Sequence, residues 1–310
     1  MVQQNRTTGI ITAIKVFANS PAFEAGMLPG DILYQVDGET VTGKDLDLVV
    51  KENIRGEEGT YVDITVLRGE NAEETPLHVE RRSIEVPTVE YQMLENQVGY
   101  IYVTQFDEVT AKQFEDAIDD LEGQGMEKLV IDLRNNPGGV LDTAVEMLAY
   151  VLPEDKLDGM LVYTADKNGE GDRYFCKDGK IQRESDDGSR DSRYPKEDGH
   201  ELDVPLAVLV NGNSASASEV FTGAVMDYDA GIVVGTTTFG KGIVQNLIPL
   251  GDGTAIKLTT AHYYTPNGFD LHGKGLEPDV VVEMDEELQK KAVVELSEDN
   301  QLQAAIEAMN

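Results

Sequence analysis

Three short apolar runs, each followed by a turn, most constrain the fold of this 310-residue chain. The runs are Lys128–Leu133, Pro205–Val210 and Gly231–Gly235. Continuous apolar runs of this length, rich in β-branched residues, are typical of strands buried in a parallel sheet. Apolar residues recur at helical spacing in three other segments: Ala111–Leu121, Asp142–Leu152 and Glu219–Tyr228. The alternation predicts an α/β core with a mostly parallel sheet.

The turn after Pro205–Val210 carries the run NGNSASASE, from Asn211 to Glu219. Ser216 therefore lies close to the N-terminus of a predicted helix. Free backbone N–H groups and the helix dipole favour an anion there, so an oxyanion formed beside Ser216 would be stabilised. The same run also fits an ordinary N-cap cluster, in which a serine satisfies the first amides of the helix.

A second run, TTFGKGIVQ, places Lys241 where the strand Gly231–Gly235 leads through a glycine-bounded turn into the next strand. A lysine between glycines and apolar residues can lie in a dry site, where desolvation favours the neutral amine. Only the neutral amine can accept the proton of a serine hydroxyl. Gln245, four residues further on, could hold the lysine nitrogen in line. The alternative is that Lys241 is a solvated turn residue.

Residues 97–284 resemble the C-terminal processing peptidases, also called tail-specific proteases. The resemblance rests on six motifs: VGYIYVTQF, LVIDLRNNPGG, LVNGNSASASE, TTFGKGIVQ, AIKLTTAHYYTPNG and GKGLEPDV. It implies a core of crotonase-like ββα units and an active serine peptidase. By the same resemblance, Ser216 is the nucleophile, Lys241 the base and Gln245 the partner of the lysine.

Acyl transfer also needs hydrogen-bond donors for the tetrahedral oxyanion. The amide of Ala217, directly after the proposed nucleophile, is one source. The resemblance implies a second from the glycines of NNPGG, where backbone can approach a ligand closely. We favour Gly139 over Gly138. Without the resemblance, NNPGG would be read as a tight turn after a strand.

Histidine chemistry and metal binding are both disfavoured. We expect the four histidines to be structural or surface residues because none lies in a motif that demands imidazole: His78, His200, His262 and His272. A Ser-His-Asp mechanism is therefore not predicted. The chain has one cysteine, Cys176, and no HExxH motif, so we expect no metal and no cofactor.

Residues 1–85 resemble a bacterial-type PDZ peptide-binding domain, a small mixed α+β fold. The signature is NSPAFEAGMLPGDILYQVDGETV, from Asn19 to Val41, continued by RGEEG from Arg55 to Gly59. Such domains bind an extended peptide C-terminus as an added strand. The carboxylate-binding loop of the family normally precedes the strand expected at Gly9–Val16. We therefore expect this PDZ domain to lack its first strand and that loop.

The rest of the chain divides by composition. We expect a linker at 86–96, a peptidase core at 97–284 with a polar, partly mobile loop insertion at about 163–204, and a C-terminal helical segment at 285–310. The helix is predicted over Asp285–Met309, with Leu302, Ile306 and Met309 on one face that seals the core or a dimer partner.

The net charge of −33 opposes binding to nucleic acid and to anionic lipid. The sequence has no signal peptide and no apolar span near 20 residues. Because it enters abruptly into a strand pattern, we expect an N-terminal truncation, with a membrane anchor only in the full-length protein. The resemblance implies a place outside the cytoplasm, and a homo-oligomer is compatible with it.

The resulting hypothesis is a serine endopeptidase that cleaves proteins near unstructured C-termini, with a PDZ domain for recognition or gating. The alternative is a PDZ-containing peptide-binding or sensing protein whose peptidase-like domain is closed or inactive. A lipase or esterase fits less well because the GxSxG motif is missing.

Overall fold

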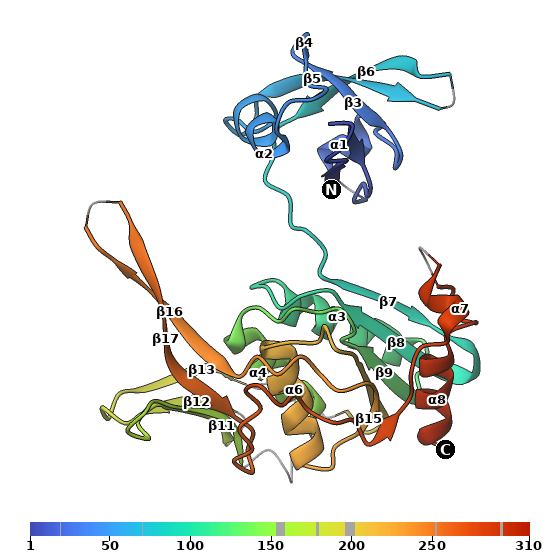
Figure 1. Ribbon diagram of the computed structural model, residues 1–310. Coiled ribbons are helices and arrows are strands. Elements are labelled where there is room, and N and C mark those ends of the chain that lie inside the picture. Colours follow the sequence, from blue (N-terminus) through green and yellow to red (C-terminus); the bar gives the residue numbers. More distant parts are fainter. Residues whose placement is uncertain are drawn as a thin grey trace. The chain divides into compact units, whose positions relative to one another are not determined.

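A computed structural model describes residues 1–18, 20–69, 71–152, 159–177, 180–195, 202–251, 253–291 and 294–310. The chain divides into two compact units, residues 1–87 and 88–310, called here the N-terminal and the C-terminal unit (Figure 1). Among the described residues, no helix combines the length and the apolar character needed to cross a membrane.

The N-terminal unit is a small antiparallel sheet with short helices. Its strands run in the order β1-β2-β3-β5-β6, with β4 paired to β3. The elements are β1 Val2–Gln4, β2 Ile11–Ala13, α1 Pro21–Glu24, β3 Ile32–Val36, β4 Glu39–Thr40, α2 Leu46–Leu48, the π-helix η1 Val49–Ile54, β5 Tyr61–Arg68 and β6 Glu73–Glu80. Alternate residues of β5 are buried, as expected for a strand with one face on a core.

The start of this unit differs in detail from the expectation. The strand expected at Gly9–Val16 is shorter, and a further strand, β1, precedes it at the edge of the sheet. Asn19, the first residue of the PDZ signature, lies outside the described residues.

A mostly parallel six-stranded sheet forms the core of the C-terminal unit. Its order is β18-β15-β14-β9-β8-β7, and only β7 runs antiparallel to its neighbour. The bounds are β7 Val89–Met93, the 3-10 helix η2 Glu95–Gln97, β8 Val98–Val103, α3 Thr110–Gly123, β9 Lys128–Asp132, α4 Leu141–Val151, β14 Leu206–Val210, α6 Ala217–Asp227, β15 Ile232–Gly235 and β18 Val280–Val281. The predicted α/β core is confirmed.

Helices cover both faces of this sheet (Figure 1). On one face, α3, α4 and α6 bury large side chains against it, among them Phe114, Leu148 and Phe221. On the other face, Leu302 and Met309 pack against apolar residues of β8, β9, β14 and β15. The apolar face predicted near the C-terminus therefore seals the core.

The single helix expected over Asp285–Met309 is wrong. Two helices, α7 Glu286–Gln289 and α8 Asn300–Ala308, occupy this segment. A new helix begins after Asp299 because its carboxylate accepts hydrogen bonds from the amides of Gln301 and Leu302, which caps the first turn.

A second, antiparallel sheet has the order β13-β12-β11-β10-β17-β16. Its strands are β10 Met160–Ala165, β11 Asp172–Lys177, β12 Lys180–Ser185, β13 Arg190–Pro195, β16 Ile243–Pro249 and β17 Ala255–Tyr264. The loop predicted for about 163–204 is therefore wrong for its described part, which forms a meander. Of the side chains of β11 and β12 that the structure describes, only Tyr174, Cys176 and Ile181 are buried in the core. Strands with so few apolar residues leave a weak pattern in the sequence.

Candidate active site

Three loops meet at one edge of the parallel sheet. Adjacent strands β9, β14 and β15 run parallel, so their carboxyl ends lie side by side. The loop after β9 carries Asn135–Gly139, the loop after β14 carries Ser216, and the loop after β15 carries Lys241. The carboxyl edge of a parallel sheet is the usual place for a binding site in α/β folds. Sequence segments more than 100 residues apart thus come together here.

Ser216 has an unusual backbone conformation. Its φ is 57° and its ψ is −116°, and it is the N-cap residue of α6. Such a conformation is strained for a residue with a side chain, by about 1–3 kcal/mol, and strain of this kind concentrates at functional sites. A strand, a sharp turn with a strained serine and a helix also form the nucleophile elbow of other hydrolases. The geometry is thus present without the GxSxG pattern.

Ser214 and Ser218, on either side of Ser216, use their hydroxyls in structural hydrogen bonds. The buried Ser214 hydroxyl donates to the carbonyl of Leu133 at 2.7 Å, and the buried Ser218 hydroxyl donates to the carbonyl of Asn136 at 3.0 Å. Both bonds fasten the serine loop to the loop after β9. Ser216, in contrast, is half-buried and remains accessible.

One buried carboxylate joins the serine loop to the lysine loop. Oε2 of Glu219 accepts hydrogen bonds from the amide of Ser216 at 2.9 Å and from the amide of Lys241 at 2.8 Å. Its Oε1 accepts from the Thr238 hydroxyl at 2.6 Å and from the amide of Gly240 at 2.7 Å. Glu219 is fully buried. The backbones of Ser216 and Lys241 are therefore held next to each other by the same oxygen atom.

Lys241 is half-buried, so the structure does not place it in a fully closed site. Gln245 is exposed, on β16, and its amide donates a long hydrogen bond of 3.4 Å to the Thr259 hydroxyl. The side chain of Gln245 thus contacts β17. The role of Gln245 as the partner of Lys241 stays a prediction.

The glycine loop lies directly against the serine. A Cβ atom added to Gly138 would lie 2.7 Å from Cβ of Ser216 and 2.8 Å from the amide nitrogen of Ala217, and φ of Gly138 is 92°. Only glycine fits such a close approach at positive φ. The amide of Gly138 donates to Oδ1 of Asn136 at 2.9 Å. Within the described residues, the amides of Gly139 and Ala217 have no protein acceptor, which suits them to bind an oxyanion.

Three of the four histidines can be placed, and His200 lies outside the described residues. His78 contacts Asp63 in the N-terminal unit, with its Nδ1 2.6 Å from Oδ1. Nδ1 of His262 lies 3.3 Å from Oδ2 of Asp270. The ring of His262 also packs edge-to-face with that of His272, with centroids 4.9 Å apart. In the part of the chain that the structure describes, these three histidines thus contact an aspartate or each other.

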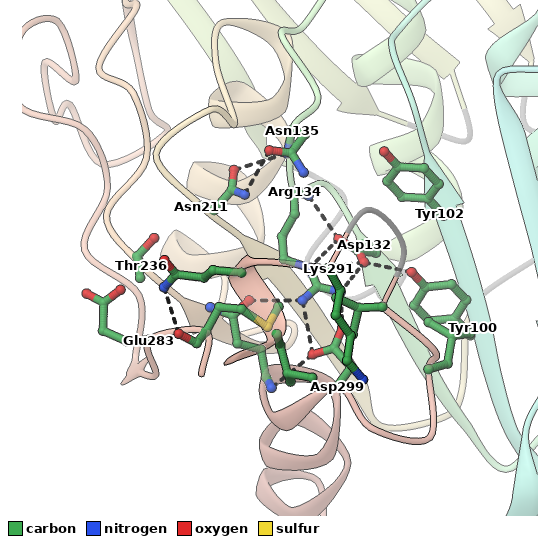
Figure 2. A pocket seen from close by; sticks show the side chains of 16 residues that line it. Tyr100, Tyr102, Asp132, Arg134, Asn135, Asn211, Thr236, Glu283, Lys291 and Asp299 are labelled. Carbon is green, nitrogen blue, oxygen red and sulfur yellow. Dashed lines mark hydrogen bonds and ion pairs between the residues drawn. The ribbon is translucent and has the colours of Figure 1, made fainter. Parts of the chain in front are cut away.

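Behind the loops, on the α8 side of the sheet, lies a cavity of about 720 Å³ (Figure 2). Its wall includes Arg134, whose guanidinium donates to the carboxylates of Asp132 and Asp299 at 2.6 and 2.7 Å. Burial lowers the pKa of Arg134, but the hydrogen bonds to these two aspartates outweigh burial and raise it. The hydroxyl of Tyr100 donates to the carboxylate of Asp132 at 2.7 Å. Burial raises the pKa of the Tyr100 phenol, and the negative charge of Asp132 raises it further. This network fastens β9 to the start of α8.

Sequence reasoning missed both Glu219 and this arginine network. In sequence, Glu219 is the first residue of the helical pattern Glu219–Tyr228, although the spacing Ser216-x-x-Glu219 fits a capping box and could have suggested its contact with the serine amide. Two partners of Arg134, Asp299 and Gln301, are more than 160 residues away in the chain, so no local pattern marks them.

Comparisons with known proteins agree with this geometry. The model of peptidase family S41 matches residues 97–282, more than half of the chain, and a PDZ domain model matches residues 2–79. The chain belongs to peptidase family S41. A "Probable CtpA-like serine protease" from Staphylococcus aureus is 39% identical over 264 residues, which cover 85% of this chain and 48% of that protein. A protein of the same description from Staphylococcus haemolyticus has the same identity and coverage. This S41 chain thus spans about half the length of the curated relatives it matches.

Solved structures share the fold of this chain. A photosystem II D1 C-terminal processing protease is 28% identical with a TM-score of 0.51, over 91% of this chain and 71% of that one. A putative S41 protease from Bacteroides fragilis has a TM-score of 0.57 at 18% identity, over 100% of this chain and 81% of that one, and supports the fold alone. The resemblance to the C-terminal processing peptidases is confirmed.

Proposed function

We propose that this S41 chain is a serine endopeptidase in which Ser216 is the nucleophile and Lys241 the general base and acid. The observation that carries the proposal is the shared hydrogen-bond acceptor: Oε2 of Glu219 holds the amides of both residues. A nucleophile and its base must be held in a fixed mutual geometry, and a buried carboxylate with four donors provides such a support.

In the proposed reaction, the neutral amine of Lys241 takes the hydroxyl proton of Ser216 as Oγ attacks the scissile carbonyl carbon. The carbonyl oxygen becomes an oxyanion, and the amides of Ala217 and Gly139 donate hydrogen bonds to it. The ammonium of Lys241 then gives its proton to the leaving amine, and an ester to Ser216 remains. Water, deprotonated by the same lysine, hydrolyses this ester and regenerates the serine.

The substrates we propose are polypeptides with unstructured C-termini, recognised or admitted through the PDZ domain. Two features of the N-terminal unit support this. β1 is the edge strand of its sheet, which is the position where a peptide adds as a strand. A groove of about 730 Å³ in this unit is lined by apolar side chains that include Phe17, Val50 and Ile54. The extracytoplasmic location and the homo-oligomer stay predictions.

The proposal is tested by incubating the protein with an unfolded polypeptide and following cleavage by mass spectrometry. Ser216→Ala and Lys241→Ala should each abolish cleavage while the thermal unfolding temperature stays near that of the wild type. Ser83→Ala and Lys112→Ala, both at exposed positions, are matched controls that should cleave normally. Normal cleavage by Lys241→Ala would exclude this lysine as the base. No cleavage by the wild type would favour the alternative of a binding protein.

A further inference from the structure

An exposed apolar ribbon leads away from the proposed active site. Strands β16 and β17 pair as a two-stranded ribbon that projects from the body of the C-terminal unit (Figure 1). β16 is the edge strand of its sheet, and its residues from Gln245 onward are exposed. The ribbon carries large exposed aliphatic side chains: Leu247 is 70% exposed, Ile248 44%, Ile256 50% and Leu258 48%.

The apolar residues lie on both faces of the ribbon. Leu247 and Ile248 are consecutive, so their side chains point to opposite faces. Ile248 is paired with Ile256, which places a second aliphatic residue beside it. Contiguous exposed apolar surface of this kind marks a binding surface in a folded protein.

The free edge of β16 is also unprotected. Natural edge strands usually carry charges or prolines that block pairing with another chain. β16, Ile243–Pro249, contains no charged residue, and its only proline is the last residue. Its outward N–H and C=O groups are therefore available to pair with an extended backbone.

The strand is continuous with the catalytic loop. β16 begins at Ile243, two residues after Lys241, and the pairing register shifts between Val244 and Gln245. Such bulges bend a strand and are common next to active sites. A chain paired along β16 would therefore run directly into the lysine loop.

We propose that the unstructured polypeptide substrate binds as an added strand on the free edge of β16, with apolar side chains against Leu247 and Ile248. This inference rests on the proposed function and defines the substrate segment: extended, uncharged and apolar. Backbone hydrogen bonds can form with any extended chain, as cleavage of unfolded proteins requires. The preference for apolar side chains comes from the contacts with Leu247 and Ile248. A second copy is a poorer occupant, because each copy carries a net charge of −33 and the two would repel.

The test measures binding without cleavage. In the Ser216→Ala protein, the dissociation constant of a fluorescent, unstructured peptide with a central Val/Ile/Ala segment is measured by anisotropy. Leu247→Glu should raise it by about 10-fold, because a charge replaces an apolar contact. Val281→Glu is the matched control, since Val281 is 61% exposed in β18, at the edge of the other sheet, and should leave the dissociation constant unchanged. Circular dichroism checks that both variants fold.

A second measurement tests the backbone pairing itself. N-methylation of single peptide amides should weaken binding by about 3- to 10-fold at every other residue, because alternate amides of an added strand face its partner. Equal binding by the Leu247→Glu and Val281→Glu proteins, or an N-methyl pattern without this alternation, would overturn the inference. A wild-type dimer that Leu247→Glu dissociates would also overturn it in favour of a second copy. Because the assay reads binding, with mass spectrometry confirming that the peptide stays intact, these outcomes do not depend on whether Ser216 is the nucleophile.

Discussion

Replacing Glu219 by glutamine changes one atom in the contact that joins the two proposed catalytic loops. The carboxylate accepts four hydrogen bonds, from the amides of Ser216, Gly240 and Lys241 and from the hydroxyl of Thr238. A glutamine of the same shape has one oxygen and one NH₂ group. In either orientation of the glutamine side chain, its NH₂ group, which is itself a donor, faces two of the four donors.

The less costly orientation of the glutamine points its NH₂ group at Thr238, whose hydroxyl can turn and accept. The amide of Gly240 is then left without an acceptor. One unsatisfied buried donor costs about 1–3 kcal/mol, and the loss of charge-assisted bonds adds a similar amount. We expect Glu219→Gln to lower the free energy of unfolding by about 3 kcal/mol. A shift of the lysine loop by about 1 Å would lower kcat by about 100-fold.

Two assays separate these effects of Glu219→Gln. Urea unfolding gives the change in stability, and cleavage of an unstructured peptide at a temperature where the variant is fully folded gives kcat. The matched control is Glu127→Gln, an exposed glutamate between α3 and β9, which should change neither quantity. A Glu219→Gln protein with wild-type kcat and wild-type stability would refute the role assigned to this carboxylate.

Three further predictions concern other contacts. Gly138→Ala places a methyl group against Ser216 at a backbone φ of 92°, so stability should fall by about 1–3 kcal/mol and peptide cleavage should nearly cease, as measured by calorimetry and kcat. Arg134→Met leaves two buried carboxylates without their cation and should cost about 3–5 kcal/mol in urea unfolding. Burial opposes ionisation of Asp31, but hydrogen bonds, first among them that from Arg68, lower its pKa. The ionised form of Asp31 therefore stabilises the N-terminal unit above about pH 4, and this contribution is lost as the pH falls through the lowered pKa; Asp31→Asn should remove it in unfolding measured at pH 3 and pH 6.

The sequence predicted those parts of the fold that leave a strong local pattern. β14 and β15 are runs of buried aliphatic residues between glycines and asparagines, and α6 follows at helical spacing. The meander at β11 and β12 was missed because, among the side chains described there, these strands bury only three apolar ones, too few for a clear alternation. The break between α7 and α8 was missed because the cap at Asp299 interrupts an otherwise helical composition.

Local motifs in the sequence mark the candidate residues of the site, but not the contacts that support them. Short motifs mark Ser216 and Lys241, and parallel neighbours in the sheet bring their loops to one edge. Glu219 belongs to the helix pattern in sequence, and only the tertiary structure reveals that its carboxylate also contacts the lysine loop. The exposed position of Gln245 likewise follows from the way the ribbon of β16 and β17 projects from the body of the C-terminal unit, which spacing alone does not tell.

The central claim is that Lys241 activates Ser216. It is tested most directly by incubating the protein with a fluorophosphonate and mapping the adduct by mass spectrometry, in the wild type and in Lys241→Met, where an apolar chain of similar length replaces the amine. We predict an adduct on Ser216 in the wild type and labelling slower by about 100-fold or more in Lys241→Met. An adduct on another residue, or wild-type labelling without the lysine, would contradict the claim.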